Sequence, residues 1–109
     1  MQDLAYVRFL SLMRAVYKDD NDARRVDDLL GYLYETTRAS RQINMTDLVK
    51  RESFGTLQTL TKYLRRMTSE GLVAINPGDD RRTSIVSLTA KGIARLSERE
   101  DLLNQAVKG

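Results

Sequence analysis

The segment TDLVKRESFGTLQTLTKYLRRMTSEGLVAINPGDDRRTSIVSLT, residues 46–89, decides the fold. Its apolar residues follow the period of a helix over residues 46–52 and again over 56–69, which predicts two helices there. Residues 53–55 break the pattern, and Gly55 supplies the backbone freedom that a tight turn needs. A short helix joined by a tight turn to a longer helix predicts a helix-turn-helix.

The second half of the same segment predicts a β-hairpin. Gly71 ends the longer helix, and short strands rich in apolar and β-branched residues follow over 72–75 and 84–88. The loop between them has eight residues, 76–83, and we expect a loop of this length to project from the fold. The predicted fold class is mainly α with a small β-hairpin (α+β), a winged helix-turn-helix.

Both flanks of this segment are also predicted to be helical. We expect helices over residues 3–18 and 23–39, a short strand over 42–44, and a last helix that follows Thr89. The acidic run 19–22 predicts a turn, because the glycine and distal glutamate of a calcium loop are absent. The expected helix N-caps are Asp22, Thr46 and Thr89.

The 109 residues suit a single domain. We divide it into an N-terminal dimerisation helix over 1–20, a winged core over 23–89 and a C-terminal helix over 90–109 that also serves dimerisation. The first helix is apolar around most of its circumference, so it must be covered on more than one side, and a second copy of the chain can supply that cover. The expected dimerisation residues are Tyr6, Phe9, Leu10, Met13, Tyr17 and Leu103.

The composition excludes several classes of function. The chain has no Cys and no His, so thiolate sites, the usual proton shuttle and the commonest metal ligand are all missing. No phosphate-binding glycine-rich loop or nucleophile-base pair is found in the sequence. We therefore expect no enzyme activity, no catalytic residue, no metal and no cofactor. Because no signal peptide or long apolar run is visible, we expect a cytoplasmic protein without a membrane partner.

The net charge of +3 is unevenly distributed along the chain. Residues 1–37 carry a net charge of −2, residues 38–91 a net charge of +5, and residues 92–109 none. All the excess positive charge therefore lies on the helix-turn-helix and the hairpin. A basic patch confined to one part of a fold suits phosphate binding, although a solvated basic face has the same pattern.

The solvent face of the helix over 56–69 suits the reading of duplex DNA. A helix fits the major groove, where Gln58 can pair bidentately with adenine and Lys62 can reach guanine or phosphate. An ordinary amphipathic surface helix is the alternative. The base-reading residues we expect are Thr56, Gln58, Thr59 and Lys62. The phosphate contacts we expect are Arg38, Arg41, Lys50, Thr61, Arg65 and Arg66.

The projecting loop presents charged residues at its tip, namely Asp79, Asp80, Arg81 and Arg82. An arginine placed beside the recognition helix would reach the neighbouring minor groove, whose negative potential attracts it. An adjacent aspartate can hold that arginine in an extended conformation. The alternative is a solvated hairpin tip whose charges serve solubility.

The stretch DDRRTSIVSLTAKG resembles the wing signature of the MarR family, in which Asp-x-Arg precedes an aliphatic residue and Leu-Thr. Those places are taken here by Asp80, Arg82, Val86, Leu88 and Thr89. Upstream, TLTKYLRRMTSEGLV resembles that family's recognition helix running into the first wing strand. The resemblance spans residues 24–96. It implies that Arg82, held by Asp80 and supported by Arg81, enters the minor groove.

The resemblance also implies a symmetric homodimer built from the terminal helices. The expected function is therefore a sequence-specific regulator of transcription, a repressor that binds double-stranded DNA at an inverted-repeat operator. The family often binds small aromatic effectors between the dimer helices and the winged domain. The turn ESFGT is one residue longer here, and the dimer region is reduced, so a small-molecule effector is possible but unsupported by the sequence. Four tyrosines are candidates for the core, the interface or such a pocket: Tyr6, Tyr17, Tyr32 and Tyr34.

Two other functions fit the same features. Winged helices also serve as protein-interaction modules, in which case the basic face would dock an acidic partner. Against this reading, the exposed face of the helix over 56–69 lacks the large apolar anchors of interface centres. Weakly specific architectural DNA binding is the other alternative, because phosphate contacts supply affinity without sequence preference.

Overall fold

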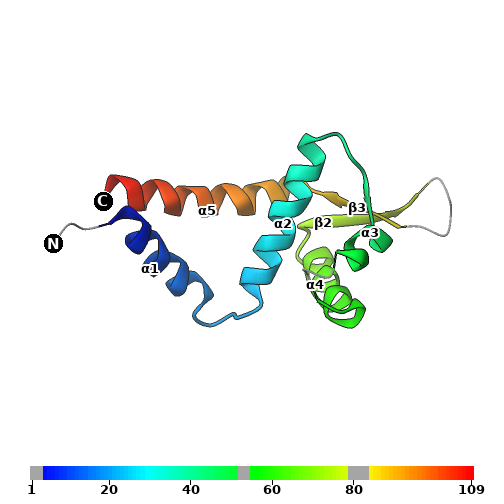
Figure 1. The fold of residues 1–109 in the computed structure, drawn as a ribbon, viewed down its shortest axis with the longest axis horizontal. Coiled ribbons are helices and arrows are strands. Elements are labelled where there is room, and N and C mark those ends of the chain that lie inside the picture. Colours follow the sequence, from blue (N-terminus) through cyan, green and yellow to red (C-terminus); the bar gives the residue numbers. More distant parts are fainter. Residues whose placement is uncertain (1–3, 52–54, 79–83) are drawn as a thin grey trace.

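The structure is a computed structural model that describes residues 4–51, 55–78 and 84–109. These residues form five helices and three strands in an elongated body of 58 × 27 × 23 Å (Figure 1). The helices are α1 Ala5–Tyr17, α2 Ala23–Arg38, α3 Met45–Lys50, α4 Leu57–Ser69 and α5 Ala90–Lys108. The strands are β1 Ile43–Asn44, β2 Val73–Pro77 and β3 Ser84–Leu88. The expected fold class, mainly α with a small β-hairpin, is confirmed.

The three strands form one antiparallel sheet in the order β1-β3-β2. Val86 of β3 lies at its centre, opposite Ile43 of β1 on one side and Ile75 of β2 on the other. The short strand predicted before α3 therefore belongs to the same sheet as the hairpin.

The hairpin is paired further than the sequence predicts. Pro77 pairs with Ser84, so the connecting loop is residues 78–83, and the expected loop over 76–83 was too long. Proline cannot donate a backbone hydrogen bond, which is why it is tolerated at the end of an edge strand such as β2.

The core lies where α2 and α4 pack with the sheet. Leu30 of α2, Leu60 of α4 and Val86 of β3 belong to one buried cluster. Its other buried members are Val26, Leu29, Leu33, Ile43, Leu48, Tyr63, Leu64, Met67, Leu72 and Val73. Each fully buried large apolar side chain stabilises the fold by roughly 1.5–3 kcal/mol. This cluster therefore fixes α4 against α2 and the hairpin.

Two helices end in Schellman motifs. Gly71, predicted to end α4, has a φ of 77°, and its N–H donates to the Thr68 carbonyl at 3.0 Å. The N–H of Leu72 donates to the Met67 carbonyl at 2.8 Å, which completes the motif. Ser40, with a φ of 58°, occupies the equivalent left-handed position after α2.

The expected N-caps are only partly right. Thr89 caps α5 through a side-chain hydrogen bond, as predicted. Asn44, and not Thr46, caps α3, because Asn44 and Asp47 form a capping box. Asp22 stands at the N-cap position of α2 but makes no side-chain cap hydrogen bond there.

The start of α5 is fastened to the junction of α4 and β2. The Thr89 hydroxyl donates to the Gly71 carbonyl at 2.6 Å, and the Thr89 N–H donates to the Leu72 carbonyl at 3.2 Å. A Cβ on Gly92 would lie 2.3 Å from the Leu72 carbonyl oxygen and 2.7 Å from Cδ1 of Leu88. Only glycine fits this approach without displacing its neighbours.

The other end of α5 carries α1, at the end of the molecule away from the hairpin (Figure 1). None of the α1 residues, all of which the structure describes, is buried. The Arg8 side chain donates to the Ala106 carbonyl at 2.8 Å and ties the two helices together. Large apolar side chains stay exposed around this contact, namely Leu4, Tyr6, Val7, Leu103 and Val107. One chain therefore leaves this apolar surface uncovered.

Candidate nucleic-acid interface

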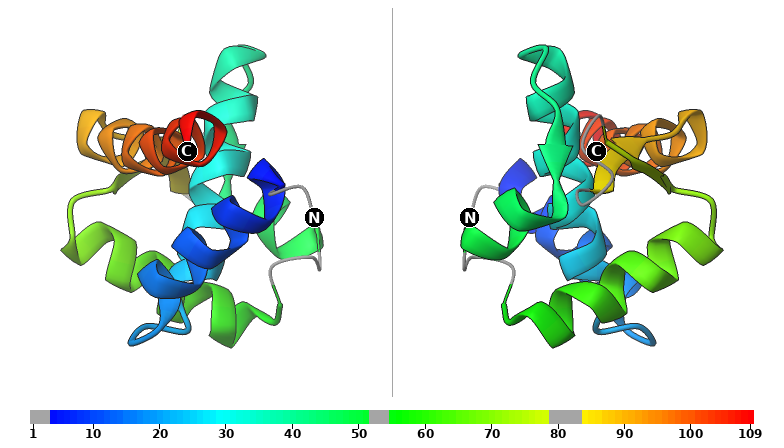
Figure 2. Two further views of the ribbon diagram at one scale, coloured as in Figure 1. Left: turned by 90° about the vertical axis from the view of Figure 1, so that its left-hand side faces the viewer. Right: turned by 90° about the vertical axis from the view of Figure 1, so that its right-hand side faces the viewer.

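Helices α3 and α4 form the helix-turn-helix. Lys50 ends α3, and α4 begins after its N-cap residue Thr56. In the turn, Gly55 has a φ of 94°, a left-handed conformation that favours glycine, as the sequence predicts. Residues 52–54 of the turn lie outside the described part of the chain. Figure 2 shows α4 running across one edge of the molecule.

The four expected base-reading residues lie on the first two turns of α4 or at its cap. Gln58 and Lys62 are exposed and one turn apart. The Thr56 hydroxyl accepts a hydrogen bond from the Thr59 N–H at 3.2 Å, and the two hydroxyl oxygens are 3.1 Å apart. This cap fixes the start of α4, where side chains would meet base edges.

Two of the expected phosphate contacts on α4 have different surroundings. Arg65 is exposed, whereas the Thr61 hydroxyl donates to the Leu57 carbonyl of its own helix at 2.7 Å. Both residues line a shallow, mainly apolar hollow of about 430 Å³, to which Met45 and Ile75 also contribute. Arg65 is therefore better placed than Thr61 to meet a phosphate.

Arg66 is engaged within the chain. Its Nη1 donates to Oδ1 of Asp20 at 2.9 Å, its Nη2 donates to Oδ2 of the same carboxylate, and its Nε lies 3.4 Å from Oε2 of Glu70. Hydrogen bonds from Arg66 hold the pKa of Asp20 below its ordinary value. The sequence predicted a phosphate contact for Arg66, but in this structure two carboxylates of the same chain occupy its guanidinium.

Asp22 makes the neighbouring contact between the α1–α2 loop and α4. The Tyr63 hydroxyl donates to Oδ1 of Asp22 at 3.3 Å, and Nζ of Lys62 lies 3.3 Å from Oδ2. The Lys62 side chain remains 68% exposed. These contacts were not predicted from the sequence, although an acidic loop and a basic helix in one chain were a signal that the two could pair.

The other expected phosphate contacts are Arg38, Arg41 and Lys50, and all three are exposed. Arg38 is the last residue of α2, and Arg41 follows it closely. Figures 1 and 2 show the C-terminal end of α2 and α4 on opposite sides of the hairpin. The end of α2, where Arg38 lies, is thus away from α4, whereas Lys50 lies at the helix-turn-helix turn.

The expected wing is the β2–β3 hairpin. The β2–β3 hairpin projects beyond α3 (Figure 1), and the structure describes its strands as far as Pro77 and Ser84. The loop-tip charges predicted to act in the minor groove, Asp80, Arg81 and Arg82, lie outside the described residues, as does Asp79.

No family model matches the chain, and no curated protein matches it in sequence. Solved structures do match it. One is BpsR of Bordetella bronchiseptica, whose DNA binding is regulated by 6-hydroxynicotinic acid. It has a TM-score of 0.66 and 23% identity over 95% of this chain and 71% of that chain. A cysteine-to-serine mutant of E. coli MarR has a TM-score of 0.56 and 26% identity over 96% of this chain and 79% of that chain.

The same E. coli mutant has also been solved in complex with operator DNA. That structure matches with a TM-score of 0.56 and 25% identity over 95% of this chain and 81% of that chain. The chain has a MarR-like fold. The likeness extends beyond residues 24–96, where the sequence alone resembles the MarR family, and includes the terminal helices.

In this MarR-like fold the four tyrosines do not share one pocket. Tyr32 packs against the core, and Tyr6 is 69% exposed. Tyr34 lines a shallow hollow against α5, and Tyr17 lines another at the α1–α2 corner. A common effector pocket built from these four side chains is therefore not formed within one chain.

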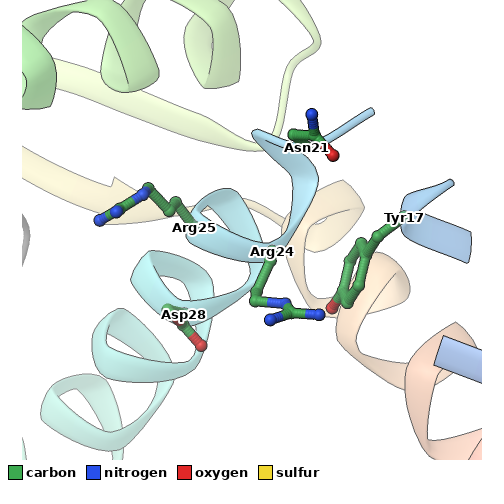
Figure 3. Close-up of a pocket in the computed structure, with 5 residues that line it drawn as sticks. All are labelled: Tyr17, Asn21, Arg24, Arg25 and Asp28. Atoms are coloured by element: carbon green, nitrogen blue, oxygen red, sulfur yellow. The ribbon is translucent and has the colours of Figure 1, made fainter. Parts of the chain in front are cut away.

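The hollow at the α1–α2 corner has a volume of about 470 Å³ and is lined by Tyr17, Asn21, Arg24, Arg25 and Asp28 (Figure 3). The Arg24 guanidinium lies 5.3 Å from the centre of the Tyr17 ring, whereas Arg25 points away from that ring. Two cationic side chains and one carboxylate give the hollow a mixed charge.

Tyr17 was expected at the dimer interface, but its hydroxyl bonds within the chain. It donates to Oδ2 of Asp27 at 2.7 Å, and Nε of Arg99 donates to the same oxygen at 2.8 Å. Burial, followed by the bond to Asp27, raises the pKa of Tyr17 above its ordinary value. These bonds join α1, α2 and α5.

The described residues contain no group of three or more acidic side chains placed to hold a metal ion. No helix in this part of the chain has the length and apolar character needed to cross a membrane.

Proposed function

We propose that this chain regulates transcription by binding double-stranded DNA sequence-specifically through α4. The observation that carries the proposal is the exposed face of α4, where Gln58 and Lys62 follow the turn of a helix-turn-helix. The MarR-like fold supports it, because one matched structure with this fold is complexed with operator DNA.

The start of α4 enters the major groove in this proposal. Gln58 reads adenine, Lys62 reads guanine or phosphate, and the hydroxyls of Thr56 and Thr59 adapt to neighbouring bases. The exposed cations Lys50 and Arg65 contact phosphates on either side of the groove. Arg38, Arg41 and Thr61 make weaker phosphate contacts in this proposal, because Arg38 and Arg41 lie at and after the end of α2 and the Thr61 hydroxyl bonds to the Leu57 carbonyl.

The wing completes the contact. Arg82, held by Asp80 and supported by Arg81, enters the minor groove next to the recognition helix. Replacement of Arg82 by Ala should weaken operator binding by more than about 1 kcal/mol. Unchanged affinity of this variant would refute the wing assignment.

The regulator acts as a homodimer and as a repressor that occupies its operator. The apolar surface that α1 and α5 leave exposed supports dimerisation, with Val107 64% exposed and Tyr6 69% exposed. A two-fold dimer places two recognition helices on half-sites about one helical turn apart, so the operator is an inverted repeat.

Selection from a pool of randomised duplex DNA at moderate salt tests the proposal. An enriched inverted repeat would support both sequence-specific reading and two-fold dimerisation. A pool that returns without a motif would remove sequence-specific regulation and leave architectural binding, which depends on phosphate contacts alone.

A pair of glutamine variants locates the reading residue. Gln58→Ala should cost about 1–3 kcal/mol of discrimination at one base pair of the selected site. Gln42→Ala removes an exposed glutamine outside α4 and serves as the matched control. An unchanged base preference of the Gln58 variant would remove the reading role from Gln58 and leave it to the other exposed residues at the start of α4.

A further inference from the structure

The loop that joins α1 to α2 is bonded to the recognition helix. Asp22 accepts a hydrogen bond from Tyr63 and pairs with Lys62. Asp20 accepts two hydrogen bonds from Arg66, which lies one turn further along α4. We call this set of five residues the loop clamp. It holds the loop against two successive turns of α4.

Within the loop clamp, the Asp20–Arg66 pair has the most restrictive geometry. Two parallel N–H donors of one guanidinium meet two oxygens of one carboxylate, a geometry that lysine cannot reproduce. Both side chains are partly buried, with 29% of Arg66 and 40% of Asp20 exposed. Glu70 contacts the remaining Nε and fixes the guanidinium from the same helix.

The position of the loop makes this pair more than a surface contact. α1 ends at Tyr17, three residues before Asp20, so the loop clamp links α1 to α4 over a very short stretch of chain. α1 itself packs chiefly on α5 and presents the uncovered apolar surface. A shift of α1 must therefore reach α4 unless the loop clamp opens.

We propose that Asp20, through Arg66, is a positioning residue that fixes the orientation of α4 relative to the dimerisation helices. It thereby sets the separation of the two recognition helices in the dimer, and this inference rests on the proposed function. Neither residue touches DNA in the proposal.

The competing explanation of the same contacts predicts the opposite effect. If Asp20 only masked the charge of Arg66, its removal would free a cation on α4 and would tighten binding to any DNA. If Asp20 positions α4, its removal weakens binding to the selected operator, whereas binding to random duplex, which does not depend on that orientation, does not fall. The sign of the effect on operator affinity therefore separates the two.

The chain offers a matched control in the same loop. Asp19 is exposed and has no side-chain partner among the described residues, so Asp19→Asn makes the same charge change without touching the loop clamp. We expect Asp20→Asn to weaken operator binding by about tenfold, within the usual range for coupling between sites, and Asp19→Asn by less than about twofold.

Arg66→Lys sharpens the test because it keeps the charge but loses the two-pronged geometry. This variant should weaken operator binding about as much as Asp20→Asn does. If Arg66→Lys binds the operator like the wild type, or if Asp20→Asn tightens operator binding, the proposal is overturned.

A second measurement needs neither DNA nor a dimer. Because the chain has no Cys, spin labels on Ser11→Cys in α1 and Ser69→Cys in α4 report one intrachain distance once labelled chains are diluted with unlabelled ones. The distance distribution should be narrow in the parent and broader with Asp20→Asn, and Asp19→Asn should leave it narrow. A distribution that Asp20→Asn leaves unchanged would overturn the proposal.

The two measurements keep this inference separate from the proposed function. Broadening by Asp20→Asn in a protein that selects no operator would refute the proposed function and leave the loop clamp as a structural link. An unchanged distribution in a protein that does select an operator would refute the loop clamp alone.

Discussion

The two ends of the molecule are built on different principles. At the hairpin end, α2, α4 and the sheet enclose a cluster of buried apolar residues, including Leu30 and Leu60 at 0% exposure. At the other end, α1 has no buried residue, and the second half of α5 buries only Ala106. One end completes its core within the chain, whereas the other leaves large apolar side chains exposed.

This difference separates two kinds of stability. The winged core is stabilised by contacts that exist in a single chain, so it does not depend on protein concentration. The packing of α1 and α5 gains its full stabilisation only when the exposed apolar surface is covered, so it should depend on concentration.

The largest expected effect is in the winged core. Leu30→Ala should lower the free energy of unfolding by about 2–5 kcal/mol, because the cavity adds to the lost burial. Leu12→Ala in α1, where the side chain is only half-buried, should cost clearly less in the same urea titration. Equal costs would contradict the contrast between the two ends.

The next effect should appear only at the α1–α5 end. Val107→Asp places a charge on an apolar side chain that is 64% exposed, and it should weaken the dimer by at least about tenfold through the burial of an unpaired charge. Sedimentation velocity would measure the change, and circular dichroism should show that the helices persist. Asn104→Asp adds the same charge at an exposed polar residue and controls for net charge. A Val107 variant that stays dimeric would place the interface elsewhere.

A smaller effect is expected where the two ends are joined. Thr89→Ala removes the cap of α5 and the bond to the Gly71 carbonyl, and should cost about 1 kcal/mol of unfolding free energy. Thr89→Ser keeps the hydroxyl and should recover most of this loss. If both variants are equally destabilised, the methyl group rather than the hydroxyl matters.

The smallest effect is the dependence of stability on acid. Because Arg66 lowers the folded-state pKa of Asp20 below 3.8, the pair stabilises the fold above that pH and loses its contribution as the pH falls through the lowered pKa. Partial exposure limits the size of the contribution. In urea titrations repeated below about pH 4, the free energy of unfolding should fall less steeply with decreasing pH for Asp20→Asn than for the wild type. An identical pH dependence in the two proteins would show that the Asp20–Arg66 pair does not contribute to stability.

Local patterns predicted most of the winged core from the sequence. The period of α4, the glycine in the turn and the end of α4 at Gly71 depend on residues a few positions apart, and all three are confirmed. The cap of α3 was missed, because Asn44 and Thr46 are both competent caps and the reciprocal bond with Asp47 decides between them.

Contacts between distant residues were beyond the reach of those patterns. Arg66 pairs with Asp20, 46 positions away, and a spacing rule within α4 could only describe it as an outward-facing cation. The same holds for Tyr17, whose hydroxyl meets Asp27 and Arg99 from two other helices. Apolar periodicity identified α1 but could not predict the hydrogen bonds of Tyr17, its last residue.

The proline that closes β2 also affects solubility. β2 is an edge of the sheet, and Ile75 is 39% exposed on it, so its backbone could serve as a template for a strand from another molecule. Pro77 removes one backbone donor at the end of that strand and shortens any ladder that could grow there. A protein with exposed apolar side chains on its terminal helices thus has, at its sheet, a feature that opposes open-ended aggregation.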